Sequence, residues 1–170
     1  MKKRGQEIFG MSFGMFFAIL LIIAFIGVAV YVIYYFISLG SCTKVGLFYD
    51  DLETEIEKTW KSDGPRTEDF ESSVPSGVAK VCFGNLTQSA ITTADQATQK
   101  SLDDEYYQDV DNNIFFYPSD KACDGDGAST KLQHVTIQKF FCVPVENGVA
   151  KVRLQIGSRE TLVTLKELPT

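Results

Sequence analysis

Four cysteines are the residues of this 170-residue sequence with the plainest chemistry, because paired thiols oxidise to disulfides in an oxidising compartment. They are Cys42, Cys82, Cys123 and Cys142. None belongs to a Cys-x-x-Cys pair, and the single histidine, His134, is too few for a Cys/His zinc site of ordinary spacing. The even number therefore predicts two disulfides, with no metal and no cofactor.

A second motif is the acceptor sequence for N-linked glycans, Asn85-Leu86-Thr87, which makes Asn85 a candidate glycosylation site. The sequence contains no Gly-x-Ser-x-Gly, no His-Glu-x-x-His and no phosphate-binding loop. His134 lies in a segment with the composition of a β-strand, so we expect it to be structural or exposed. We therefore expect no catalytic residues, and the protein is not expected to be an enzyme.

All four cysteines follow a long apolar segment, residues 8–39, which contains no charged residue and no Asn, Gln or His. A run of about 18 or more apolar residues can cross a bilayer as a helix, in which every backbone group bonds internally. We therefore predict a transmembrane helix over residues 8–39, with the lipid bilayer as its partner. At about 1.5 Å per residue this helix would be about 48 Å long, whereas the hydrocarbon core is about 30 Å thick.

Two explanations of this excess length remain open. In the first, Tyr31, Tyr34 and Tyr35 form an aromatic belt at the lipid head groups, so that the hydrocarbon span ends near Val30. In the second, the upper part of the helix is buried against other copies of itself.

Small residues in the apolar segment favour such self-association. Gly10, Gly14 and Ala18 lie four residues apart and therefore share one helix face. Small side chains at this spacing let two helices approach closely. We expect these three residues to form a helix-packing surface between copies of the chain.

Charge indicates the orientation and excludes one class of partner. Basic residues precede the apolar segment, in Met1-Lys2-Lys3-Arg4, so residues 1–7 are expected in the cytoplasm and everything after Leu39 outside. Residues 8–170 contain 13 basic and 21 acidic residues, a net charge of about −8. Such a chain repels phosphate groups, so we expect no nucleic acid as a partner.

The N-terminal sequence Lys2-Lys3-Arg4-Gly5-Gln6-Glu7, followed directly by the apolar segment, resembles the class III signal of archaeal type IV pilins and archaellins. In that family a prepilin peptidase cuts between the Gly and the Gln and leaves the apolar helix on the mature subunit. The resemblance implies processing between Gly5 and Gln6, and a helix that moves from the membrane into a filament core. The family tends to carry a Glu four residues after the Gln, where this chain has Gly10.

The segment after the apolar run predicts an amphipathic extension of the helix over residues 40–61. Phe48, Leu52, Ile56 and Trp60 recur every four residues, with charged residues between them. Gly40-Ser41 is expected either to kink the helix or to interrupt it. A long first helix, apolar and then amphipathic, also resembles that of type IV pilins.

Residues 62–170 predict an extracytoplasmic, disulfide-bonded domain rich in β-structure. Its expected parts are a loop at 62–76, a strand at 78–83, a short helix within 92–109 with a Thr93/Gln96 capping box, a strand at 114–117 and a loop at 120–130. Three strands at 134–145, 149–156 and 162–165, with a hairpin turn at Glu146-Asn147-Gly148, predict an antiparallel meander and no parallel sheet. The predicted fold class is α+β, with the meander packed against the amphipathic helix.

Chain geometry favours one of the three possible disulfide pairings. From Cys42 to Lys61 the helix would rise roughly 29 Å, and the strand after Gly77 would return over most of that distance. Cys82 would then lie near Cys42, within the roughly 7 Å between Cα atoms that a disulfide allows. We therefore predict the pairs Cys42–Cys82 and Cys123–Cys142.

The sequence supports two hypotheses of function. The first is a structural subunit of a type IV pilin-like cell-surface filament, which rests on the Lys-Arg-Gly-Gln signal and the overlong apolar helix. The second is a single-pass surface protein that stays in the membrane and whose outer domain binds a partner or an envelope component. This alternative rests on Gly10, where a Glu is expected, and on the tyrosine belt.

Overall fold

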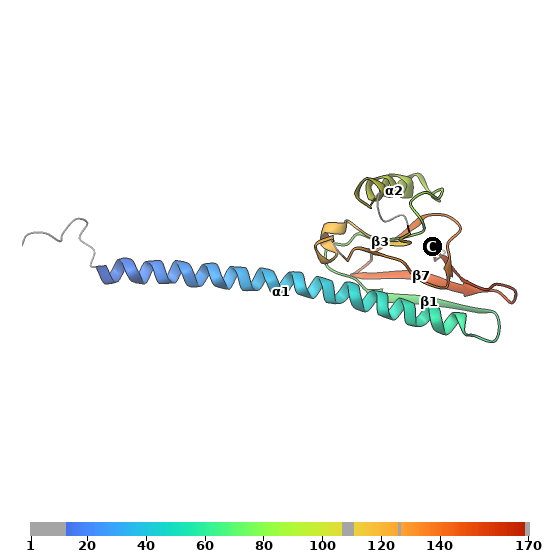
Figure 1. Ribbon diagram of the computed structural model, residues 1–170, viewed down its shortest axis with the longest axis horizontal. Helices are drawn as coiled ribbons and strands as arrows, with labels where there is room; N and C mark the ends of the chain where they lie inside the picture. The colour runs from blue at the N-terminus through green and yellow to red at the C-terminus, as the bar shows by residue number, and fades with distance from the viewer. Residues whose placement is uncertain (1–12, 107–110, 126, 169–170) are drawn as a thin grey trace, which may run out of the picture. The chain divides into compact units, whose positions relative to one another are not determined.

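The computed structural model describes residues 13–106, 111–125 and 127–168. The chain forms two compact units, of which the first ends at Ile37 and the second begins at Ser38. Helix α1 (Phe13–Trp60) supplies the described part of the first unit and the first element of the second (Figure 1). The alternative in which Gly40-Ser41 interrupts the helix is wrong, since α1 continues through both residues, and Thr43 donates a hydrogen bond from Oγ1 to the Leu39 carbonyl at 3.0 Å.

The part of α1 in the second unit is amphipathic, as predicted. Val45, Phe48, Leu52 and Ile56 are buried at a spacing of three or four residues and form one apolar stripe. Trp60, which the periodicity places on the same stripe, lies at its margin and is 36% exposed. The stripe therefore specifies which side of the helix packs against the rest of the unit.

Two four-stranded sheets make up most of the second unit. The first, sheet A, has the order β1 (Arg66–Ser73), β7 (Val149–Ile156), β8 (Val163–Lys166), β5 (Val135–Thr136), and the second, sheet B, has the order β4 (Ser129–Thr130), β3 (Ile114–Tyr117), β2 (Lys80–Phe83), β6 (Phe141–Pro144). The remaining elements among the described residues are α2 (Thr93–Tyr106) and two short 3-10 helices, η1 (Ser119–Lys121) and η2 (Cys123–Gly125). All strand neighbours are antiparallel except β5 and β8, so the unit is α+β with mainly antiparallel sheets.

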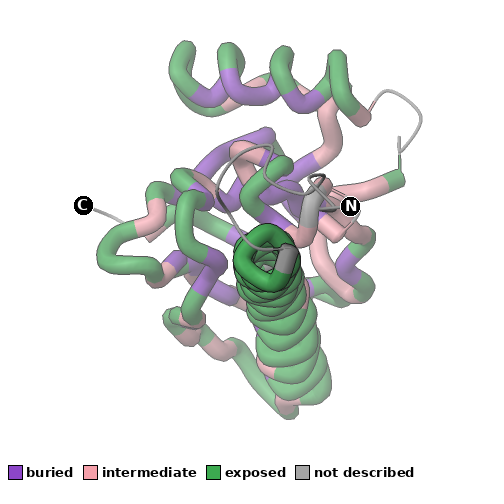
Figure 2. The backbone as a smooth tube through the Cα atoms, turned by 90° about the vertical axis from the view of Figure 1, so that its left-hand side faces the viewer, coloured by how far each residue is buried: buried purple, intermediate pink, exposed green. Residues whose placement is uncertain are grey.

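Sheet B is buried on both faces. On β2, Val81 and Phe83 belong to the main core with α1 and sheet A, whereas Cys82 belongs to a smaller cluster on the opposite face. Helix α2 covers that face, and in Figure 2 the buried parts of its coil, in purple, lie toward the strands. Strands covered on both sides are expected to be apolar throughout, which accounts for the continuous apolar runs in sheet B.

The predicted loop over residues 62–76 is wrong, because β1 lies within it. The strand has the sequence RTEDFESS and buries only Phe70, whose ring packs edge to face on Phe48 at 5.6 Å between centroids. Its eight residues pair in register with β7, and on the open face Asp69 lies opposite Arg153 and Glu71 opposite Lys151. Cross-strand ion pairs and the β7 backbone thus specify a strand that has almost no apolar pattern of its own.

The predicted three-stranded meander is only partly correct. The turn at Glu146-Asn147-Gly148 is confirmed as a tight hairpin turn, with φ of 54° at Asn147 and 77° at Gly148, and β7 and β8 pair antiparallel. The predicted strand 134–145, however, splits into β5, which pairs parallel to β8, and β6, which pairs with β2 in the other sheet. The split follows from burial, because Ile137 packs in the main core and Phe140 packs beneath α2.

Helix α2 is confirmed, but its N-terminal cap lies one residue earlier than predicted. Thr92 Oγ1 accepts a hydrogen bond from the Asp95 backbone N–H at 3.1 Å and donates one to Asp95 Oδ2 at 2.8 Å. Thr93 and Gln96 therefore do not form the cap, because Asp95 takes the place that was assigned to Gln96.

The single histidine and the single tryptophan stack on each other at the end of α1. The rings of His134 and Trp60 lie 3.8 Å apart between centroids, at an interplanar angle of 16°. Trp60 Nε1 also donates to the Thr161 carbonyl at 3.0 Å, and the His134 carbonyl accepts from the Val163 N–H at 2.9 Å. The stack therefore joins the end of α1 to the segments before β5 and β8.

The stack can be tested with His134→Asn. Asn tolerates the positive φ of 58° at this position, so the change removes the ring and leaves the backbone unstrained. We expect the free energy of unfolding to fall by about 0.5–1.5 kcal/mol, the usual contribution of an aromatic pair. The fluorescence of Trp60, the only tryptophan, should shift at the same time. Unchanged emission and stability would show that the rings do not stack in solution.

A second prediction concerns acid stability. Arg153 donates hydrogen bonds to Asp69 at 2.6 and 2.9 Å, and these bonds and the guanidinium charge hold the pKa of Asp69 below its ordinary value. A carboxylate whose pKa is lower in the folded than in the unfolded chain stabilises the fold above the unfolded pKa of about 3.9 and loses that contribution as the pH falls through the folded value. We therefore expect Asp69→Asn to lower the thermal midpoint at neutral pH and to match the parent chain in strong acid.

Lys151→Gln provides the matched control. The hydrogen bond and charge of Glu71 raise the pKa of Lys151, so the stabilisation from this lysine is present below its unfolded pKa and is lost as the pH rises through the folded value. Its removal should change the alkaline side of the stability profile and leave intact the part of the acid slope that depends on Asp69. An Asp69→Asn chain that keeps the full acid slope would contradict the assignment to the Asp69–Arg153 pair.

Candidate functional site

The most extensive exposed apolar surface lies on the part of α1 in the first unit. Its large apolar side chains from Met15 to Ile37 are between 41% and 70% exposed, and no polar face interrupts them. Soluble proteins rarely expose continuous apolar patches larger than a few hundred Å². Among the residues that the structure describes, one helix is by length and composition apolar enough to cross a membrane. Together with the disulfides, it indicates a membrane-anchored extracellular domain.

The predicted helix-packing and processing residues fall partly outside the described part of the chain. Gly5, Gln6 and Gly10 are not among the described residues. Gly14 and Ala18 both lie exposed on α1, four residues apart. Their surface is therefore open to another helix or to lipid.

The chain forms two disulfides, as predicted, but the predicted pairing is wrong. The bonds join Cys42 to Cys123 and Cys82 to Cys142. The strand that returns along α1 is β1, not the strand that contains Cys82: Phe70 packs on Phe48, and Ser72 donates to Asp51 at 3.4 Å. Because β1 occupies that position, Cys82 lies in sheet B and out of reach of Cys42.

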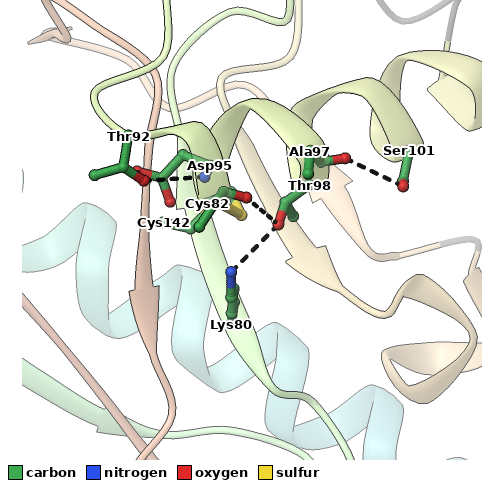
Figure 3. The surroundings of a disulfide bond; sticks show 9 residues. Lys80, Cys82, Thr92, Asp95, Ala97, Thr98, Ser101 and Cys142 are labelled. Carbon is green, nitrogen blue, oxygen red and sulfur yellow. Dashed lines mark hydrogen bonds between the residues drawn. A yellow bond between two sulfur atoms is a disulfide. The ribbon is translucent and has the colours of Figure 1, made fainter.

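The Cys82–Cys142 bond links neighbouring strands beneath α2 (Figure 3). The two residues are directly opposite each other in the β2–β6 register, with Cα atoms 3.9 Å apart. Leu102 covers them from α2, and Lys80 reaches up from β2 to donate to Thr98 Oγ1 at 3.3 Å. The bond thus forms part of the smaller core and attaches α2 indirectly to both strands.

The Cys42–Cys123 bond joins α1 to the η2 segment across 81 residues of sequence, with Cα atoms 4.2 Å apart. Two tyrosine hydroxyls donate to carbonyls of the same segment: Tyr49 to Gly127 at 2.9 Å and Tyr106 to Gly125 at 3.3 Å. Sequence reasoning missed both tyrosines, because each appears in a helical pattern and only the fold shows that they converge on one loop. The segment around Cys123 is therefore held from α1 and from α2.

Asn85, the candidate glycosylation residue, lies in a surface turn that follows β2. Its Oδ1 accepts hydrogen bonds from the backbone N–H of Thr87 at 2.9 Å and from the Thr87 hydroxyl at 2.8 Å. The Gln88 N–H closes the turn on the Asn85 carbonyl at 3.0 Å. Asn85 is half-buried and Thr87 is exposed, so the acceptor sequence is presented at the surface of the second unit.

The described residues contain no group of three or more His, Cys, Asp or Glu side chains that could hold a metal ion. His134 packs on Trp60 and is thereby committed to a packing contact. The chemical features on which the described residues do bear are the two disulfides and the glycan acceptor sequence at Asn85.

No family model, curated protein or solved structure matches this chain. Its function therefore has to be inferred from its own features. These are the exposed apolar helix, the two disulfides of the second unit and the turn at Asn85.

Proposed function

We propose that this chain is a structural subunit of a type IV pilin-like filament on the cell surface, assembled through its apolar N-terminal helix. The observation that carries the proposal is the exposure of α1 from Gly14 to Ile37 on all sides. A helix without a polar face must be surrounded by apolar partners over its whole circumference. Lipid satisfies this need before assembly, and neighbouring copies of the same helix satisfy it in a filament.

The length of the apolar part supports packing against other copies. The 25 residues from Phe13 to Ile37 extend about 37 Å as a helix, which already exceeds the roughly 30 Å of hydrocarbon in a bilayer. The apolar sequence begins still earlier, at Ile8. Helices of neighbouring subunits would cover the excess without any need for extreme tilt.

The N-terminal signal supplies the route into such an assembly. The Lys3-Arg4-Gly5-Gln6 sequence resembles the class III processing site, so a prepilin peptidase is the proposed processing partner. The basic flank keeps the N-terminus in the cytoplasm, and the disulfide-bonded unit lies outside. Within that unit, the amphipathic part of α1 packs on the β-rich layers, an arrangement that resembles the pilin subunit plan.

A second function is favoured by two specific observations. Gly10 stands where the pilin family tends to have a Glu, and Tyr31, Tyr34 and Tyr35 are 70%, 69% and 57% exposed, as an interfacial belt would be. These features suit a single-pass protein that stays in the membrane. Its outer unit would then bind a partner or an envelope component.

The N-terminal residue of the mature protein distinguishes the two functions. For a filament subunit we expect mass spectrometry to find Gln6 as the first residue, because the peptidase would remove Met1 to Gly5. Gly5→Leu should block the cut by crowding the cleaved bond, whereas Ser12→Ala, inside the apolar segment, should be processed normally. An intact Met1 on the protein from the cell surface would rule out the pilin-like route and favour the membrane-resident protein.

A further prediction concerns association. Gly14→Leu places a bulky side chain on the proposed packing face and should weaken association of the helices, which chemical cross-linking and filament yield would measure. Gly27→Leu is the matched control, because it is the same change in the same helix but away from the Gly10–Gly14–Ala18 face. If both variants assemble like the parent chain, the Gly14 face contacts lipid only.

A further inference from the structure

We propose that the Cys42–Cys123 disulfide carries tension from the apolar helix directly into the η2 segment of the outer unit, so that the pull does not have to pass along the backbone of residues 43–122. The inference rests on the anchoring part of the proposed function alone. It holds equally for a helix held in a filament and for one held in a bilayer, since in both cases a pull on the outer unit passes through α1.

Tension enters the outer unit at a defined point. Helix α1 runs without a break from Phe13 to Trp60, and the second unit begins at Ser38. Cys42 follows four residues later, about one turn of helix. Any pull between the anchored helix and a partner of the outer unit therefore reaches Cys42 before it reaches the first core residue, Val45.

From Cys42 a pull can follow either of two covalent routes. One continues along α1 and through β1, β2, α2 and β3, and it reaches Cys123 only after 81 residues. The other crosses the disulfide, where the two Cα atoms are 4.2 Å apart. The shorter route becomes taut first, so the backbone of the longer one is not stretched while the bond is intact.

The route along α1 is suited to packing and poorly suited to tension. The helix contacts the layers beside it through the side chains of Val45, Phe48, Leu52 and Ile56, which follow one another along its length. A pull directed along α1 would act on these contacts one after another, beginning with Val45. Each contact would bear the force only after the contact before it had broken. The disulfide lies ahead of all of them.

The segment that receives the pull is attached to several elements at once. Ala122 and Ala128 on either side of Cys123 are fully buried, and the Phe116 N–H of β3 donates to the Ala128 carbonyl at 2.7 Å. The Tyr49 and Tyr106 hydroxyls hold the Gly127 and Gly125 carbonyls from α1 and α2. Force that crosses the disulfide is thus distributed over sheet B and both helices.

The Cys82–Cys142 disulfide determines how much longer the unfolded chain becomes when the Cys42–Cys123 bond is removed. With both bonds intact, the taut path from Cys42 to the last residue covers the 47 residues after Cys123. Without Cys42–Cys123 it runs from Cys42 to Cys82 and from Cys142 to the end, which is 68 residues. The difference is about 21 residues, or about 70 Å at roughly 3.3–3.6 Å per residue.

The experiment pulls the full chain in detergent micelles by its two ends and records force against extension. We expect the Cys42→Ser, Cys123→Ser chain to open at lower force than the parent and to extend about 70 Å further when fully unfolded. The matched control, Cys82→Ser with Cys142→Ser, removes the same number of sulfurs and should extend no further than the parent. Equal opening forces for the parent and the Cys42/Cys123 variant would overturn the proposal.

A second measurement uses the unaltered chain and so does not depend on the folding of a variant. The chain is held at constant force while dithiothreitol is added, which cleaves a disulfide by thiolate attack on one sulfur, releases one cysteine and then closes on itself to release the other. Cleavage of Cys42–Cys123, recognised by its lengthening step, should become faster as the holding force rises. A cleavage rate that does not change with force would show that the bond lies outside the path. Neither measurement requires assembly, so a negative result here is distinct from failure of the filament proposal.

Discussion

Phe48 lies where the helix and both sheets meet, and the layers of the second unit depend on its contacts. Its ring is 1% exposed and packs edge to face on Phe70 of β1 and Phe116 of β3, at 5.6 and 5.2 Å between centroids. Such aromatic pairs contribute about 0.5–1.5 kcal/mol beyond their buried area. Because a single side chain of α1 touches sheet A and sheet B, the helix determines how the two sheets come together.

The same helix meets two environments without changing conformation. From Gly14 to Ile37 α1 has no polar face, and from Val45 onward it has a single apolar stripe. Helical hydrogen bonding continues through Gly40-Ser41, so the boundary between the two units lies in the side chains rather than in the backbone. Lipid or other helices require the first pattern, and a packed globular unit requires the second.

The elements that could be predicted from the sequence are those with a local pattern of apolar spacing or of turn residues. Both parts of α1, helix α2, strands β2 and β3, and the β7–β8 pair with the turn before it follow from apolar spacing and turn residues, and all are present. Strand β1 could not be found in this way, because its stability comes from β7, which follows about 80 residues later. Arg153 and Lys151 supply the partners for its acids, and no local pattern records that pairing.

The disulfide pairing was missed although part of its signal is present in the sequence. Cys82 and Cys142 are each the middle residue of an apolar triplet, Val81-Cys82-Phe83 and Phe141-Cys142-Val143. A continuous apolar strand indicates burial on both faces, which an outer strand along a helix does not have. Two such strands belong in one inner sheet, and side chains in the middle of both triplets then share the face away from the main core.

On that face of sheet B a mainly polar helix, α2, covers the Cys82–Cys142 disulfide. Of the buried residues of α2, only Leu102 is apolar, and the others are Asp95, Thr98 and Gln99. Gln99 donates to the Leu86 and Gln88 carbonyls at 2.8 Å each, so hydrogen bonds hold much of the helix in place. Because Leu102 is its one buried apolar residue, α2 buries little apolar area. A typical hydrogen bond contributes only about 0.5–1.5 kcal/mol to the free energy of unfolding. The Cys82–Cys142 bond links the strands beneath it covalently, so the cohesion of sheet B does not depend on the cover alone.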